Sequence, residues 1–254
     1  MKTVILAGGY GTRLREETEF KPKPLVEIGN MPILWHIMMG YAHFGYKDFV
    51  IPLGYKGNLI KRFFFDYQFN SSDLILDQDL EFGLRKVTLP NNWKVHLRDT
   101  GLDTNTGGRL FKLRDILKRN TFFCTYGDGL ANVNIEKLLE FHRKMGRVAT
   151  VTCGIPISRF GSVDFDDTGL VKSFVEKPKS DSFVSAGFFV FEPEIFDYLN
   201  EFSVLENEPL ETLAKEEQLS AFKHVEFWRP MDTYRETLEL NRMWNNNEAP
   251  WKIW

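Results

Sequence analysis

The 254-residue sequence has little of several features that mark specialised classes of protein. It contains two cysteines, Cys124 and Cys153, in apolar runs without metal-site spacing, so we interpret both as reduced core residues. Basic and acidic residues nearly balance, 32 against 35, which gives no electrostatic reason to expect nucleic acid or an anionic membrane as a partner. No apolar run is long enough to span a bilayer, and glycine follows too soon, at Gly8, for a signal peptide. These absences predict a cytoplasmic enzyme or binding protein.

What the sequence does contain is an alternation of strands and helices, which predicts a mostly parallel sheet. The first expected strand is Thr3–Ala7. Further strands are expected at Asp48–Leu53, Thr121–Tyr126, Val148–Cys153, Gly161–Phe165, Val171–Val175 and Gly187–Phe191, with edge strands within Leu74–Leu97. Helices are expected at Pro32–Phe44, Asn58–Tyr67, Gly108–Leu117, Asn134–Met145, Pro193–Asn200 and Glu208–Gln218. The aromatic tail, with Trp251 and Trp254, is expected to dock on the core; contact with another subunit is the alternative.

A glycine-rich turn, Gly8-Gly9-Tyr10-Gly11-Thr12-Arg13, directly follows the first strand. Glycines remove Cβ atoms where backbone N–H groups must approach an anion or a flat base, so the turn suits a phosphate or nucleotide. The spacing fits neither the P-loop nor the dinucleotide motif G-x-G-x-x-G, which implies another kind of nucleotide site. A tight structural turn with an exposed Arg13 fits the same residues.

A second motif, Lys21-Pro22-Lys23-Pro24, follows within ten residues. Prolines fix φ and can hold a lysine ammonium beside a polyphosphate, although a solvated basic turn would look the same. Together, the two motifs resemble those of the sugar-phosphate nucleotidyltransferases. In that family the arginine and the second lysine grip the nucleoside triphosphate, so the resemblance implies catalytic roles for Arg13 and Lys23. It also implies one α/β domain over residues 1–254. This is a Rossmann-like nucleotidyltransferase domain with a mostly parallel mixed sheet flanked by helices, plus small β and helical elaborations. The elaborations at roughly 150–254 are expected to bind the acceptor.

Further short motifs extend the resemblance along the chain and are similar to the branch that forms CDP-glucose from CTP and glucose 1-phosphate. They are Asp99-Thr100-Gly101, Thr106–Leu110, Tyr126–Gly129, Glu176-Lys177-Pro178, Gly187–Val190, Trp228–Thr233 and Ala249–Lys252. The resemblance implies CTP as the nucleotide, Mg²⁺ as the cofactor (Mn²⁺ can substitute) and a homo-oligomer. The nucleotide-binding residues that it implies are Leu6, Ala7, Gly8, Gly9, Gly11, Thr12, Arg13, Lys23, Thr106, Gly107 and Asp128.

Two carboxylates, Asp128 and Asp232, stand where the resembling family has its metal ligands. Hard carboxylate oxygens suit Mg²⁺, provided that the fold unites the two residues. Alternatively, Asp128 is a turn-former between two glycines and Asp232 is a helix N-cap. The acceptor-binding residues that the resemblance implies are Tyr126, Gly127, Glu176, Lys177, Ser185, Ala186, Gly187, Trp228 and Arg229. Here, too, Glu176-Lys177-Pro178 could be a plain surface turn. An acceptor phosphate that attacks the α-phosphorus in line needs neither a covalent intermediate nor a general base.

Two residues of this acceptor set depart from the glucose branch. Ser185 replaces an asparagine whose amide contacts the sugar, and Arg229 replaces a neutral glutamine. A guanidinium suits a carboxylate or a second phosphate better than a hexose, so these residues slightly favour L-glutamine phosphate, the acceptor of a related branch in capsular phosphoramidate assembly. The alternative is glucose 1-phosphate, with Ser185 acting through water and Arg229 paired with an acid such as Glu226. A non-catalytic nucleotide-sensing domain is a remote alternative.

Overall fold

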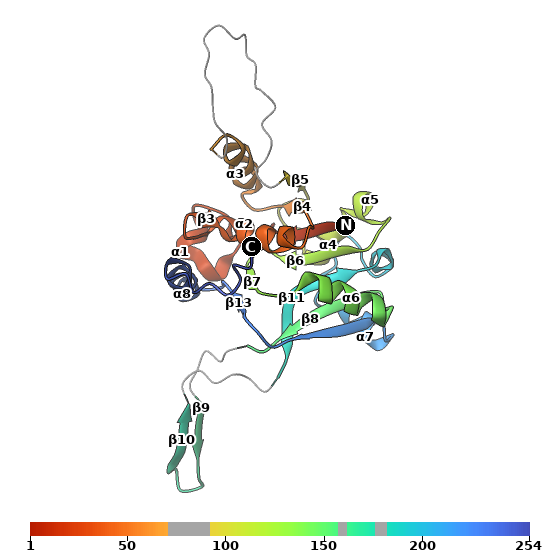
Figure 1. Cartoon of the computed structure of the whole chain (residues 1–254). Helices are drawn as coiled ribbons and strands as arrows, with labels where there is room; N and C mark the ends of the chain where they lie inside the picture. The colour runs from red at the N-terminus through yellow and green to blue at the C-terminus, as the bar shows by residue number, and fades with distance from the viewer. Residues whose placement is uncertain (71–91, 157–161, 176–181) are drawn as a thin grey trace.

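The structure, a computed structural model, describes residues 1–70, 92–156, 162–175 and 182–254. Its centre is a seven-stranded sheet in the order β12-β8-β11-β6-β1-β4-β5 (Figure 1). The strands of this sheet are β1 (Lys2–Leu6), β4 (Asp48–Leu53), β5 (Lys94–Asp99), β6 (Phe122–Tyr126), β8 (Ala149–Gly154), β11 (Val184–Phe191) and β12 (Leu219–His224). All neighbours pair in parallel except β11, which runs antiparallel to both β6 and β8. The predicted mixed, mostly parallel α/β sheet is therefore confirmed.

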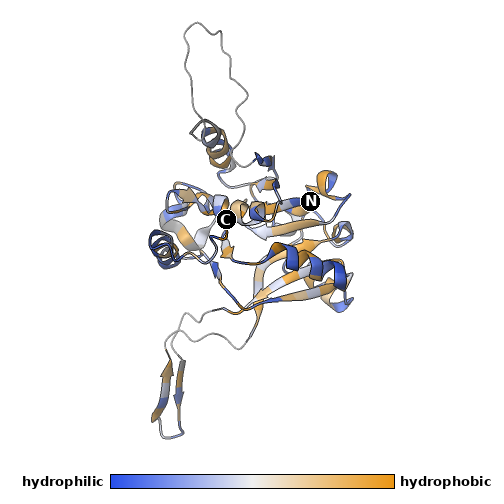
Figure 2. Ribbon diagram, viewed as in Figure 1, coloured by the Kyte–Doolittle hydropathy of each residue, from blue (hydrophilic) through white to orange (hydrophobic). Residues whose placement is uncertain are grey.

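Helices cover both faces of this sheet because its central strands are apolar on both sides. In β1, Ile5 belongs to one buried cluster and Val4 to the other, as the two-residue period of a strand requires. Figure 2 shows the apolar sheet between more polar helices. The helices are α1 (Arg15–Thr18), α2 (Ile33–His43), α3 (Gly57–Asn70), α4 (Thr106–Phe111), α5 (Arg114–Leu117), α6 (Ile135–Met145), α7 (Glu208–Lys215) and α8 (Tyr234–Asn245), with short 3-10 helices η1 (Thr12–Leu14), η2 (Lys23–Leu25) and η4 (Pro193–Asp197).

Several expected elements need correction. The single helix expected at Gly108–Leu117 is two short helices, α4 and α5, and the helix expected at Pro193–Asn200 is the 3-10 helix η4. Strand β12 was not predicted, because its sequence, Leu-Ser-Ala-Phe-Lys-His, is only weakly apolar and directly follows the helix expected at Glu208–Gln218. Of the region Leu74–Leu97, residues 74–91 lie outside the described residues, and β5 is the strand found at its end.

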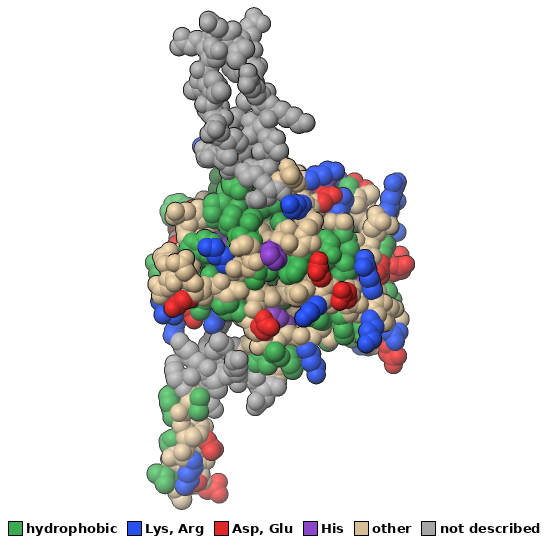
Figure 3. Space-filling view, in the orientation of Figure 1, with side chains coloured by type: hydrophobic (Ala, Val, Ile, Leu, Met, Phe, Trp, Pro, Cys, Tyr) green, Lys and Arg blue, Asp and Glu red, His purple; other side chains and the backbone are tan. Residues whose placement is uncertain are grey.

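Small two-stranded sheets complete the fold, and one of them projects from the body. β2 (Glu27–Ile28) pairs with β3 (Met31–Pro32), and β7 (Gly129–Ala131) pairs with β13 (Trp228–Pro230). The third pair, β9 (Ser162–Phe165) with β10 (Val171–Val175), forms the arm at the bottom of Figure 1, and Figure 3 shows this arm standing clear of the body. Among the described residues, no helix combines the length and the apolar character needed to cross a membrane.

The remaining expectations about the core agree with the structure. Cys124 and Cys153 are both free thiols, the first buried and the second half-buried. Trp251 is 1% exposed, and its indole Nε1 donates to Nδ1 of the buried His36 at 3.4 Å. Trp254 packs edge-on against Trp35, with 5.8 Å between the ring centroids. The aromatic tail therefore docks on the core, as predicted, and does so at α2.

Candidate active site

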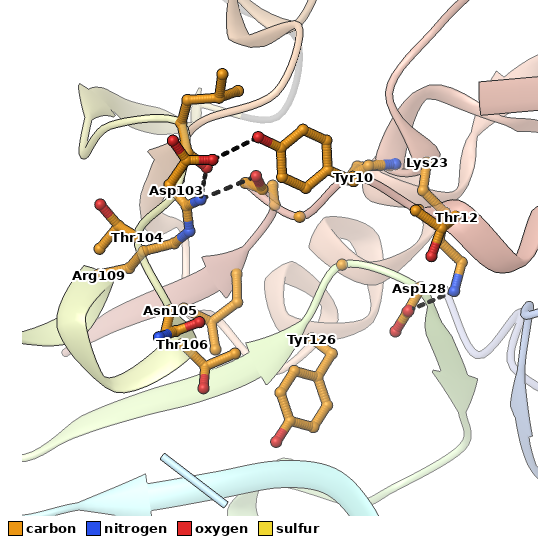
Figure 4. A pocket seen from close by; sticks show the side chains of 18 of the residues that line it. Tyr10, Thr12, Lys23, Asp103, Thr104, Asn105, Thr106, Arg109, Tyr126 and Asp128 are labelled. Atoms are coloured by element: carbon orange, nitrogen blue, oxygen red, sulfur yellow. Dashed lines mark hydrogen bonds and ion pairs between the residues drawn. The ribbon is translucent and has the colours of Figure 1, made fainter. Parts of the chain in front are cut away.

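A pocket of about 480 Å³ opens at the carboxyl ends of the parallel strands β1 and β6. Loops after parallel strands meet at this edge of an α/β sheet, which is where such folds bind ligands. The glycine turn forms one wall of the pocket, residues 102–106 face it, and Tyr126–Asp128 lie below (Figure 4). We therefore take this pocket as the candidate active site.

The glycine turn is held from behind by a buried arginine. The Arg109 side chain, on α4, is 3% exposed, and its guanidinium lies so close to Gly8 that a Cβ on that glycine would stand 2.3 Å from Arg109 Cζ. Burial lowers the pKa of Arg109 from its ordinary value, yet the guanidinium stays charged. It donates to the carbonyl oxygens of Gly8 (2.9 Å), Leu53 (3.0 Å), Gly101 (2.8 Å) and Leu102 (3.1 Å) and to the hydroxyl of Thr100 (2.7 Å). One side chain thus ties the ends of β1 and β4 to the loop that follows β5.

At the opposite end of the pocket, Lys23 lies between the two predicted metal ligands. Its Nζ is 2.6 Å from Asp128 Oδ2 and 2.7 Å from Asp232 Oδ1, and its side chain is 10% exposed. Burial alone would lower the pKa of Lys23, but the two carboxylates outweigh burial and raise it above the ordinary value. The fold therefore unites an ammonium and two carboxylates that lie far apart in the chain.

The two aspartates meet because short elements join their chain segments. β7 pairs with β13, with Gly129 opposite Pro230, and the Met231 N–H donates to the Asp128 carbonyl oxygen at 2.8 Å. Asp232 then lies just before α8, whose N-cap is Thr233 in a capping box with Glu236. The alternative interpretation of Asp232 as the helix N-cap is therefore wrong.

Tyr126 forms the floor of the pocket and is itself oriented by an acid. Its hydroxyl donates to Glu206, whose other carboxylate oxygen accepts from Thr106 Oγ1 at 2.7 Å. Burial, together with this carboxylate, raises the pKa of Tyr126, so the phenol stays protonated. Gly187 packs against the same ring: its φ is +79°, and a Cβ there would lie 2.3 Å from Tyr126 Cδ2.

Most of the residues predicted to bind nucleotide converge on this pocket. Those that line it are Leu6, Ala7, Gly8, Gly9, Gly11, Thr12, Lys23, Thr106 and Asp128. Gly107 does not: it packs against Ser203, which a Cβ would approach to 2.7 Å. Arg13 lies in η1, and the structure does not describe its side chain.

The predicted acceptor residues are only partly gathered there. Tyr126 and Gly127 line the pocket, whereas Ser185, Ala186, Gly187, Trp228 and Arg229 do not. Glu176 and Lys177 lie outside the described residues.

The two residues that depart from the glucose branch have local partners. Ser185 is exposed, and its Oγ accepts from the Gly187 N–H at 3.3 Å. Arg229 NH2 lies 3.5 Å from Glu239 Oε1, so the guanidinium is paired with an acid on α8. Glu226, the partner suggested by the sequence, instead accepts from Asn132 Nδ2 at 2.6 Å. Arg229 therefore has a partner within the chain, although not the expected one.

Sequence reasoning missed the second wall of the pocket. Leu102, Asp103, Thr104 and Asn105 line it, and Tyr10 reaches across to Asp103, with 2.6 Å between Tyr10 Oη and Asp103 Oδ1 (Figure 4). The available signal was the motif Asp99-Thr100-Gly101, directly before these residues, but it carried no chemistry of its own.

The positions of Asp128 and Asp232 are compatible with a divalent metal. Two carboxylate oxygens face one another across a gap that already holds one cationic group, the Lys23 ammonium. Hard oxygen donors are the ligands that Mg²⁺ takes, and a site with two carboxylates leaves positions for water and phosphate. Among the described residues, no group of three or more acidic, histidine or cysteine side chains could hold a metal.

Comparison with known proteins assigns the chain to a family. The family model "Nucleotidyl transferase" matches residues 2–229. A glucose-1-phosphate cytidylyltransferase of Salmonella typhi is 46% identical over 260 residues, covering 100% of both chains, and that of Salmonella typhimurium is equally similar. The solved structure of a UDP-glucose pyrophosphorylase bound to UDP-glucose covers 97% of this chain and 98% of its own, with a TM-score of 0.68 at 17% identity, which shows the fold alone.

Proposed function

The chain belongs to the nucleotidyl transferase family, and we propose that it transfers CMP from CTP to glucose 1-phosphate, releasing pyrophosphate and forming CDP-glucose. The observation that carries this proposal is the 46% identity, over the whole of both chains, with two glucose-1-phosphate cytidylyltransferases. The pocket supports it, because a glycine turn, a buried lysine and two carboxylates are the groups that a triphosphate and its metal require.

In this reaction a phosphate oxygen of the acceptor attacks the α-phosphorus of CTP, and the bond to the bridging oxygen of pyrophosphate breaks. Backbone N–H groups of Gly8, Gly9 and Gly11 would cradle the phosphates, and Lys23 and Arg13 would neutralise the charge that develops on pyrophosphate. Asp128 and Asp232 would hold Mg²⁺, which supplies further neutralisation of phosphate charge when bound. The acceptor phosphate is already an anion, so no side chain has to remove a proton.

The choice of acceptor rests on the comparisons and on Arg229. The sequence alone slightly favours L-glutamine phosphate, whereas the relatives that match over their full length act on glucose 1-phosphate. The Arg229 guanidinium already lies 3.5 Å from Glu239 Oε1, so an α-carboxylate would have to share it with that acid. Both observations support the glucose acceptor.

The non-catalytic alternative has less support. A domain that only sensed nucleotide would have no need of two carboxylates facing a shared cation, and Lys23, Asp128 and Asp232 are all in place. The homo-oligomer and the cytoplasmic location remain predictions, the first from the resemblance and the second from the sequence.

The test is pyrophosphate release with CTP and Mg²⁺, offering glucose 1-phosphate and L-glutamine phosphate in parallel and comparing kcat/KM. We expect strong preference for glucose 1-phosphate, with R229Q changing that preference little. A higher kcat/KM with L-glutamine phosphate than with glucose 1-phosphate would overturn the proposed acceptor. CTP binding without release of pyrophosphate from CTP, whichever acceptor is present, would overturn the proposed reaction.

A further inference from the structure

The ammonium of Lys23 occupies the position where a divalent cation would sit. Its nitrogen is 2.6 Å from Asp128 Oδ2 and 2.7 Å from Asp232 Oδ1, and Mg²⁺ takes carboxylate oxygens at about 2.1 Å. An ion that bridged these same two oxygens would have to use the space that the ammonium fills. The metal and the ammonium are therefore alternative occupants of one gap.

The backbone and the aliphatic stem of Lys23 are fixed, so only the end of its side chain can move. Pro22 and Pro24 flank Lys23 and restrict the backbone, and η2 is closed by the Leu25 N–H on the Pro22 carbonyl oxygen at 2.8 Å and the Val26 N–H on the Lys23 carbonyl oxygen at 3.0 Å. The lysine stem is itself buried. Leaving the carboxylates requires the ammonium to swing toward the open pocket, where it would need a new anionic partner.

We propose that in the free protein the Lys23 ammonium serves as an internal cation between Asp128 and Asp232, and that a divalent ion takes this place only when the triphosphate of an incoming nucleotide draws the ammonium away. The inference rests on the proposed function, which supplies the triphosphate. It makes Lys23 a residue with two successive anionic partners, first the aspartates and then phosphate.

Two consequences follow from this exchange. The free protein binds divalent metal weakly, because the cation must compete with a charge that is already hydrogen-bonded to both ligands. The metal therefore enters together with the nucleotide, and removing the ammonium should expose a metal site in the absence of any nucleotide.

The experiment measures Mn²⁺ binding to the nucleotide-free protein by electron paramagnetic resonance. The K23M variant keeps the length of the side chain and removes the charge, and we expect its Kd for Mn²⁺ to fall at least tenfold below that of the wild type. The matched control is K21M, in the same motif, because Lys21 pairs with Glu17 and Glu27 at 3.6 and 3.7 Å and not with the aspartates. K21M should bind Mn²⁺ as the wild type does.

Two further arms keep the test decisive. The double variant K23M/D232N should lose the gain in Mn²⁺ affinity; if it kept the gain, the metal would be binding elsewhere and the inference would be overturned. If K23M fails to fold without metal, as judged by circular dichroism, K23Q replaces it, because its neutral amide can still hydrogen-bond a carboxylate.

Equal Mn²⁺ affinity in the wild type and the folded lysine variant would overturn the inference. None of these titrations contains CTP or an acceptor, so their outcome is separate from that of the pyrophosphate assay. Transfer activity with unchanged Mn²⁺ binding would leave the proposed function intact and remove only the exchange at Lys23.

Discussion

Replacing Arg109 by methionine tests whether one buried cation holds the walls of the pocket together. Methionine fills much of the same space and removes all five hydrogen bonds that the guanidinium donates. Two of the acceptors, the carbonyl oxygens of Gly101 and Leu102, accept no other hydrogen bond among the described contacts, whereas those of Leu53 and Gly8 also accept backbone N–H groups.

The expected loss of stability follows from those two carbonyl groups. A fully buried polar group left without a partner costs about 1 to 3 kcal/mol, and these two carbonyl groups are only partly buried, so the pair would cost about 2 to 4 kcal/mol. Relief from burying a cation, which is also what lowers the pKa of Arg109, offsets part of this cost. We expect the free energy of unfolding of R109M to fall by about 1 to 3 kcal/mol, which at about 2 to 4 °C per kcal/mol lowers Tm by roughly 2 to 12 °C.

Urea and thermal denaturation of R109M measure this loss, and the KM for CTP measures its effect on the pocket. KM should rise, because the Gly8 turn loses its support from behind. The control is R114M, since Arg114 is an exposed residue on the next helix and should change the free energy of unfolding by less than about 0.5 kcal/mol. If R109M were as stable as R114M, the guanidinium would not be holding these loops together.

Three other outcomes are expected. Gly187→Ala should lower the free energy of unfolding by about 3 kcal/mol, because the backbone is strained at φ +79° and the new Cβ clashes with the Tyr126 ring. The control Gly146→Ala, with φ +58° and no atom nearby, should lower it by only about 1 kcal/mol. Similar losses for the two variants would contradict the clash. Burial lowers the pKa of His36 to about 4, so the folded protein keeps this ring neutral, whereas the unfolded chain protonates it below about pH 6.5. The free energy of unfolding, measured with urea, should therefore fall by about 3 kcal/mol as pH falls from 6.5 to 4. The H36Q variant should lack that part of the pH dependence. Asp128→Asn should reduce pyrophosphate release from CTP at least about 100-fold with folding unchanged, and a near-normal rate would refute the metal role.

The first half of the site could be predicted from the sequence because its signals are local. The strand Lys2–Leu6 and the glycine turn after it are one continuous pattern, so period and turn chemistry suffice to place them at the end of a buried strand. Lys23 and Asp128 likewise occur in short motifs, and the resemblance of these motifs to the family implies phosphate and metal binding. For these residues the sequence-based prediction and the pocket lining agree.

The rest depends on pairings between distant segments, which no local pattern encodes. Asp232 reaches Lys23 only because β13 pairs with β7, and these strands are three residues each. The role of Arg109 was hidden for the same reason, since its acceptors come from three separate segments of the chain. A charged residue in a glycine-rich helix start gives no sign in the sequence that it is buried.

The docking of Trp251 on α2 has a consequence for biosynthesis. Its partner His36 lies 215 residues earlier in the chain, so the ribosome synthesises α2 long before it synthesises Trp251, which covers an apolar face of that helix. Until residues near 251 leave the ribosome, that face stays exposed to solvent and to other nascent chains, which favours association with chaperones. Contacts of such long sequence separation also slow folding, so slow acquisition of the native tryptophan fluorescence is expected to be the last step of maturation.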